Sequence, residues 1–259
     1  MCTRFYNTKI IQSSITEIYE YGEPIAYNYT NPLTNEKAER ITFNDATPEM
    51  KKERVERMKK RYLNERWKIS RLIDVNFDNR TSFLTLTFRD NVQHIESCNY
   101  EFMKFIKRLN YKIYKTKKAT IKYLAVWELQ ERGAIHYHIM LFSVPKIPYT
   151  ELSKLWKFGS INIKKVIADS KENRGRYISK YFAKNLDDPK YLIKFIGKKR
   201  FFSSKNLKKP KVTVQYNQEN LELEASKIIF QKEYFGKKKL GEDWITYPIR
   251  YTKLKTNKD

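Results

Sequence analysis

Two of the three histidines in this chain, His136 and His138, lie two positions apart. Side chains alternate between the faces of a β-strand, so in a strand these two imidazoles would share one face about 7 Å apart, the right order of separation to bind one ion. Residues 131–133 read Glu-Arg-Gly and fit a three-residue hairpin loop, with Gly133 in the left-handed conformation. That register places Glu128 directly opposite His136, and directly opposed side chains point to the same face. The spacing therefore predicts that Glu128, His136 and His138 converge on a divalent metal ion.

The predicted donor set narrows the choice of metal. Two imidazoles and one carboxylate suit Mn²⁺ and other first-row divalent metals, while Mg²⁺ would be held with more water. Gln130 and Glu131 are alternative third ligands if the hairpin register slips. On spacing alone, two histidines on the wet face of a surface hairpin are an equal alternative, and the converging glutamate favours the metal site.

A second set of reactive side chains lies about forty residues downstream. Tyr177, Tyr181 and Lys184 stand at i, i+4 and i+7, so in a helix they share one stripe, with Lys180 beside it. A phenol with a pKa of about 10 is a poor nucleophile until a nearby cation stabilises the phenolate, and the lysines can also pair with a phosphate. Attack on a phosphodiester would give a phosphotyrosine ester. The alternative is two core tyrosines in a chain that has 19 of them.

The charge of the chain indicates a polyanionic partner. Lysine and arginine number 53 against 29 acidic residues, a net charge of +24. Nucleic acid would offset this self-repulsion, with binding that weakens as salt rises; a lysine-rich surface without a partner is the alternative. Residues 190–211 contain nine basic residues and no acid, and the aromatic residues between them either stack on bases or belong to a core. The predicted DNA contacts there are Lys198, Lys199, Arg200, Lys205 and Lys208.

Several classes of protein are excluded or disfavoured. Cys2 and Cys98 are the only cysteines, too few for a disulfide framework or a cysteine zinc site. No GxxxxGK[ST] phosphate loop occurs, so unwinding of duplex DNA would need a separate helicase. No apolar run reaches the ~18–20 residues of a membrane span, and the N-terminus lacks the apolar core of a signal peptide. We expect a cytoplasmic protein without membrane contact.

Hydrophobic periodicity predicts an α+β fold, in which an antiparallel sheet is layered with helices. Residues 1–45 are expected to form loops with a short strand or two, and the last helix is expected over 219–235. Three regions are expected: an N-terminal extension (1–75) whose helix packs on the core, a catalytic domain (76–212) and a helical, basic C-terminal extension (213–259). The other predicted helices cover 47–69, 102–113, 149–158 and 174–186, and the strands cover 83–88, 123–129, 134–144 and 160–167.

Together these segments resemble the HUH endonuclease superfamily, and most closely its rolling-circle replication initiators of the two-tyrosine phage and plasmid type. The resemblance spans about residues 80–210 and leaves both ends of the chain unmatched. The histidine pair with the apolar Tyr137 between them matches the element for which the superfamily is named. The matching segments, in family order, are residues 83–87, 128–142 and 177–184, followed by a basic stretch at 204–210.

The resemblance implies both a fold and a reaction. The fold would be a five-stranded antiparallel sheet with flanking helices, of the ferredoxin-like or RNA-recognition type. A divalent ion, Mn²⁺ or Mg²⁺, would be bound by Glu128 and the two histidines. Tyr177 or Tyr181 would nick single-stranded DNA at a replication origin, with Lys180 or Lys184 balancing charge. The products would be a 5′-phosphotyrosine and a free 3′-hydroxyl, and a separate helicase and DNA polymerase would act as partners.

Two alternatives remain open from the sequence. A non-catalytic single-stranded DNA-binding protein would use the basic and aromatic surface but would need neither the converging Glu-His-His set nor lysines beside tyrosines. Another HUH enzyme, a single-tyrosine transposase or a relaxase, fits less well. A relaxase typically has a third histidine near the pair, and His94 lies far upstream.

Overall fold

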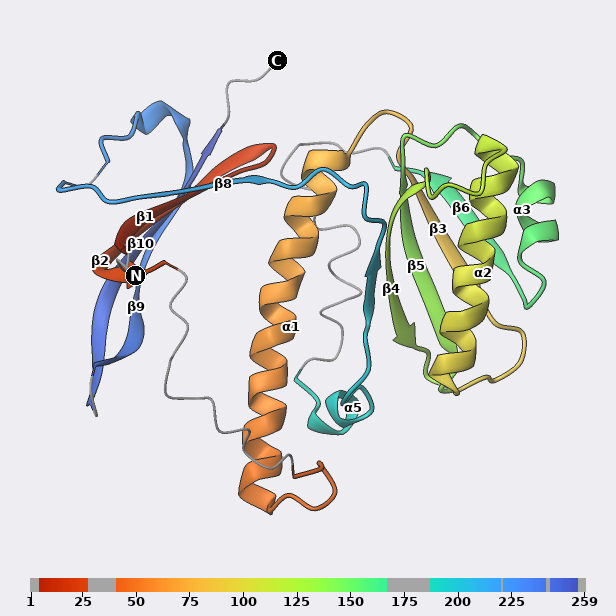
Figure 1. Cartoon of the computed structure of the whole chain (residues 1–259), viewed down its shortest axis with the longest axis horizontal. Helices are drawn as coiled ribbons and strands as arrows, with labels where there is room; N and C mark the ends of the chain where they lie inside the picture. The colour runs from red at the N-terminus through yellow and green to blue at the C-terminus, as the bar shows by residue number, and fades with distance from the viewer. Residues whose placement is uncertain (1–4, 28–40, 167–186, 220, 241–242, 256–259) are drawn as a thin grey trace. The chain divides into compact units, whose positions relative to one another are not determined.

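The computed structural model describes residues 5–27, 41–166, 187–219, 221–240 and 243–255 of the 259-residue chain. These residues form two compact units (Figure 1). One unit is continuous, Ala46–Lys209; the other combines the two ends of the chain, Met1–Asp45 and Pro210–Asp259. Each unit is built around one five-stranded antiparallel sheet. The predicted α+β class, with antiparallel sheet and helices, is confirmed, although the chain forms two sheets where one was expected.

The continuous unit has a sheet with strand order β6-β3-β5-β4-β7. In Figure 1 helix α2 lies on one side of this sheet and helix α1 on the other. The strands are β3 (Ser82–Thr87), β4 (Lys122–Leu129), β5 (Ile135–Phe142), β6 (Ile161–Lys165) and β7 (Phe201–Ser203). The helices are α1 (Pro48–Asn76), α2 (Ile95–Tyr114), α3 (Tyr149–Leu155) and α5 (Pro189–Ile193).

Helix α1 begins as its sequence predicts. The Thr47 hydroxyl accepts a hydrogen bond from the Met50 amide at 3.3 Å, and Pro48 occupies the first turn, where its missing N–H costs nothing. The helix runs seven residues beyond the predicted end at residue 69, because Ile73 and Asn76 continue its buried stripe. The amide of Asn76 donates to the carbonyl of Lys208 at 2.9 Å, which ties the end of α1 to a segment far along the chain.

The two faces of this sheet have different roles. Tyr137 lies between the two histidines on β5 and therefore points to the opposite face. Its ring stacks on Phe102 of α2, with ring centroids 4.5 Å apart and planes inclined by 2°. Helix α2 thus covers the Tyr137 face with apolar side chains, and the histidines lie on the other face of the same strand.

The second unit has a sheet with strand order β8-β1-β2-β10-β9. The predicted helix over 219–235 is wrong: residues 228–240 form a strand, preceded by a single turn of 3-10 helix, η2 (Ala225–Lys227). Residues 1–45 also hold more strand than expected. Both results have the same cause, since this sheet joins strands that lie about two hundred residues apart in the sequence. The strands are β1 (Phe5–Gln12), β2 (Ile15–Ala26), β8 (Lys211–Gln215), β9 (Ile228–Leu240) and β10 (Asp243–Lys255).

The remaining predicted elements lie near their expected positions, with bounds that shift by a few residues. Helix α2 begins seven residues before the predicted 102, because the His94 side chain accepts a hydrogen bond from the Ser97 amide and caps the helix. The expected helix over 174–186 lies outside the described residues. Among the helices that the structure describes, none has the length and apolar character to cross a membrane.

A candidate metal centre

The hairpin of β4 and β5 adopts the predicted register. Glu128 is paired with His136 and Leu129 with Ile135. The Gln130 amide donates to the Ala134 carbonyl at 2.8 Å and closes the loop. Gly133 has φ = +87°, the left-handed conformation that a side chain would strain. The turn therefore fixes which side chains of the two strands share a face, and Gln130 and Glu131 are not needed as substitute ligands.

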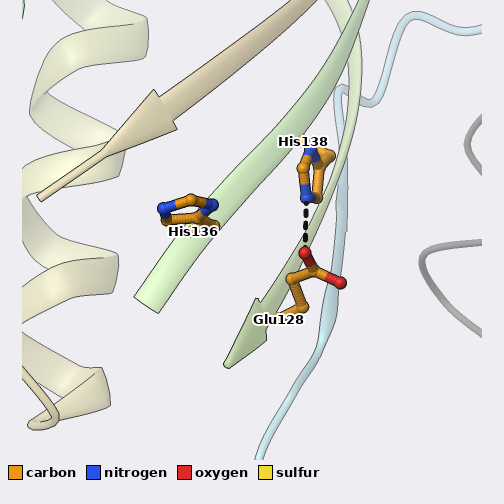
Figure 2. Close-up of side chains that lie close together, drawn as sticks. All are labelled: Glu128, His136 and His138. Atoms are coloured by element: carbon orange, nitrogen blue, oxygen red, sulfur yellow. Dashed lines mark hydrogen bonds and ion pairs between the residues drawn. The ribbon is translucent and has the colours of Figure 1, made fainter. Parts of the chain in front are cut away.

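Glu128, His136 and His138 converge on the face opposite α2 (Figure 2). Each offers one ligand atom, and the three atoms lie within 4.8 Å of one another. His138 Nε2 lies 3.0 Å from Glu128 Oε1, and both residues are buried. His136 is half-buried, so the group opens toward solvent at His136.

The geometry of this group fits one small divalent ion. Metal–ligand bonds of about 2.0–2.2 Å place two ligands of one ion at most about 4.4 Å apart. The observed upper separation of 4.8 Å exceeds this by a few tenths of an ångström, which a small side-chain rotation closes. Two neutral imidazoles and one carboxylate leave further coordination positions for water or substrate oxygen. The donor set is that of a catalytic rather than a fully closed structural site.

Strand β3 supplies a further residue to the site. Thr85 is paired with His138, and its hydroxyl lies 3.3 Å from His138 Nδ1. Since Nε2 of the same ring faces Glu128, this contact sets which ring nitrogen is turned to the ligand group. Phe83, two residues earlier on the same face, stacks on the His138 ring with centroids 5.7 Å apart. The ring is thus held by a hydrogen bond on one edge and by an aromatic face.

The hairpin loop is also anchored. The Arg132 guanidinium donates to the carbonyl of Phe88 at 2.8 Å and to that of Arg89 at 3.2 Å, just beyond the end of β3. Gly133 lies against the Gln93 side chain, where an added Cβ would come within 2.8 Å. These contacts hold the loop between Glu128 and His136 to the neighbouring strand end.

Sequence reasoning found the three converging side chains but missed Thr85 and Phe83 as their supports. The alternation of apolar residues with threonines at 83–87 showed that both residues share one face of a strand. It did not show that β3 pairs with β5, and only that pairing brings Thr85 to His138.

The predicted DNA-binding segment divides into exposed and buried residues. Lys199, Lys205 and Lys208 are exposed and Lys198 is half-buried. The segment is fixed to the sheet by the Trp127 indole, which donates to the Lys199 carbonyl at 2.8 Å. These lysines remain predicted DNA contacts.

Arg200 requires a correction, because the structure places its side chain in the interior. It is 2% exposed, and its guanidinium carbon lies 4.1 Å from the ring centroid of Phe195 and 5.3 Å from that of Tyr62. Burial lowers the pKa of Arg200, and the nearby Tyr191 and Tyr62 oppose this shift. Tyr191 and Phe195 are buried as well, which favours the core alternative for these two rings. Arg200 therefore packs in the core, where it cannot serve as a surface contact for DNA.

The four residues of the predicted nucleophile segment, Tyr177, Lys180, Tyr181 and Lys184, lie outside the described residues. Their roles remain predictions from the sequence.

Comparison with known proteins connects the chain with DNA replication. Residues 81–186 match the family of replication-associated proteins that is named for ORF2, and this match includes β3, the β4–β5 hairpin and the predicted nucleophile segment. A stretch of 147 residues is 26% identical to the Phasyl DNA replicon protein arp of Escherichia coli. It covers 47% of this chain and 49% of that protein, so the chain spans about half the length of this relative. No solved structure matches the chain.

Proposed function

We propose that this protein is a replication initiator that nicks single-stranded DNA at a rolling-circle origin and remains attached through a tyrosine. One observation carries the proposal: Glu128, His136 and His138 converge on one face of a hairpin within the segment that matches a replication-associated family. A protein that only binds DNA has no need of a buried carboxylate facing two imidazoles, because burying such groups costs free energy unless they are paired or bound to a metal.

The distribution of charge supports a DNA partner for this unit of the chain. Ala46–Lys209 contains 39 lysines and arginines and 16 acidic residues, a net charge of +23. The other unit contains 14 basic and 13 acidic residues, a net charge of +1. The excess charge therefore belongs almost entirely to the unit that holds the candidate metal centre. Affinity for a phosphate backbone would come from many such contacts.

In the proposed reaction the tyrosine replaces one ester bond by another. The phenolic oxygen of Tyr177 or Tyr181 attacks the scissile phosphorus and forms a new P–O bond, and the bond to the 3′-oxygen breaks. The phenol gives up its proton, and the departing 3′-oxygen takes one up to become the free 3′-hydroxyl. No electrons are gained or lost, so the reverse reaction can rejoin strands. Lys180 or Lys184 balances the charge on the phenolate or the phosphate.

The residues of the metal centre orient the scissile phosphate. A bound divalent ion would supply Lewis-acid polarisation of a non-bridging oxygen. Glu128 and the two histidines would hold that ion, and Thr85 would keep the His138 ring turned toward it. With two tyrosines, the second can cleave the newly copied origin while the first holds the parental end.

Cleavage of an origin-bearing oligonucleotide in the presence of Mn²⁺ tests this proposal. We expect His136→Ala and His138→Ala to abolish cleavage and leave DNA affinity largely unchanged, because affinity comes from lysine–phosphate contacts. The third histidine offers a matched control. His94 is an exposed helix cap, and His94→Asn keeps a capping side chain and should cleave normally. Cleavage at the wild-type rate by either site variant would show that the histidine pair is structural, as in a non-catalytic binding protein.

A further inference from the structure

A second basic site lies at the edge of the same sheet, where β3 begins and β6 ends. A hollow of about 410 Å³ is lined there by four cationic residues: Arg80, Lys146, Lys164 and Lys165. The other lining residues are polar or apolar, and none is acidic. All four cationic residues are exposed. The nearest acid in the sequence is Asp78: burial would raise its pKa, but hydrogen bonds from Ser143 and Thr81 outweigh burial and lower it.

The hollow is connected to the candidate metal centre through side chains of one sheet face. Lys164 on β6 is paired with Phe83 on β3, and its ammonium lies 5.9 Å from the Phe83 ring centroid. The Phe83 ring in turn stacks on His138. Two strand spacings across the sheet and two residues along it place Lys164 and His138 about 12 Å apart at their Cα atoms. A DNA strand with one phosphate at the metal centre therefore has a neighbouring phosphate within reach of the hollow.

We propose that this basic hollow binds the phosphodiester backbone of single-stranded DNA next to the scissile phosphate. The inference rests on the proposed function for the position of the scissile phosphate, and on the hollow itself for the choice of an anionic ligand. Four exposed cations in a lining that contains no acidic residue suit a chain of phosphates, and they carry no means of reading bases. The edge strand β6 leaves one side of the hollow open, so a continuous strand can pass through it.

Neutralising the hollow tests this inference. The triple variant Arg80→Gln, Lys146→Gln, Lys165→Gln keeps the side-chain stems and removes three positive charges. Lys107→Gln, Lys117→Gln, Lys118→Gln is the matched control: these three lysines are also exposed, and they lie on α2 and just after it, in the layer that covers the opposite face. The affinity of each protein for a fluorescent single-stranded oligonucleotide is measured by anisotropy across a salt series, without divalent metal.

The hollow variant should bind more weakly and depend less on salt. Three lost phosphate contacts reduce the slope of log K against log salt by about 2, at about 0.7 for each contact on a single strand. The same relation gives a loss of affinity of up to about 100-fold at about 0.1 M salt. The control should keep the wild-type slope. An unchanged slope in the hollow variant, or an equal loss in both variants, would overturn the proposal.

Two further measurements separate this inference from the proposed function. If wild-type protein fails to cleave DNA while the hollow variant still loses binding, the proposed function fails and the hollow remains a DNA site. The second measurement titrates inorganic phosphate as a probe. If the hollow variant loses binding of inorganic phosphate but keeps the wild-type affinity for the oligonucleotide, the hollow is a small-anion site and the inference is wrong.

Discussion

Thr85→Val removes the hydroxyl that faces His138 Nδ1 at 3.3 Å and keeps the shape of the side chain. We expect this change to weaken metal binding without touching any of the three ligand residues. In the metal-bound state Nε2 of His138 is a ligand, so Nδ1 carries the proton and donates it to the Thr85 oxygen. Valine leaves this donor without that acceptor in a site where His138 is 5% exposed.

The size of the effect follows from the geometry. Loss of an outer hydrogen-bond partner of a metal ligand typically costs about 10- to 100-fold in affinity, or about 1.4–2.7 kcal/mol. The Thr85–His138 contact is longer than an ideal hydrogen bond, and the Phe83 ring still holds one face of the imidazole. We therefore expect about a 10-fold increase in the Kd for Mn²⁺.

Isothermal titration calorimetry with Mn²⁺ measures this change directly. Thr85→Ser is the matched control, because it restores the hydroxyl and should bind within about threefold of wild type. Circular dichroism of each variant verifies that the strand remains folded. A Thr85→Val protein that folds and binds Mn²⁺ with wild-type affinity would refute the role assigned to β3 in this site.

Two other predictions concern buried side chains. Arg200→Gln should lower the free energy of unfolding by about 2 kcal/mol in a denaturant titration, since a desolvated guanidinium loses its aromatic contacts, whereas Lys199→Gln should leave stability unchanged and weaken DNA binding; equal stability of the two variants would contradict the burial of Arg200. Cys98 should resist alkylation at about pH 8 in a Cys2→Ser background until the protein is unfolded, because burial raises its pKa to about 11 and leaves little thiolate; rapid labelling of the native protein would contradict that burial.

The candidate metal centre was predictable because its geometry is local. A loop of three residues joins the two strands, and the left-handed Gly133 fixes the pairing of Glu128 with His136. A register that is set by a tight turn can be read from the sequence without knowledge of the rest of the fold.

The features that were missed depend on contacts between distant segments. Arg200 stands in a run of basic residues that is typical of a solvated surface, and only the packing of Tyr62 and Phe195 around it places it in the interior. The strand at Ile228–Leu240 pairs with β10, whose other neighbour, β2, comes from the start of the chain. Its own sequence has no clear alternation, so its strand character comes from these partners rather than from local propensity.

Peptide mapping of a trapped DNA–protein adduct decides whether the protein acts through a tyrosine of the predicted segment. Wild-type protein is incubated with an origin-bearing single strand and Mn²⁺, denatured and digested, and the peptide that carries DNA is identified by mass spectrometry. We predict that the adduct requires the metal and maps to Tyr177 or Tyr181. Each single Tyr→Phe variant should retain part of the adduct, and the double variant should form none while keeping its DNA affinity. An adduct on a peptide that lacks both tyrosines, or undiminished adduct in the double variant, would contradict the proposed reaction.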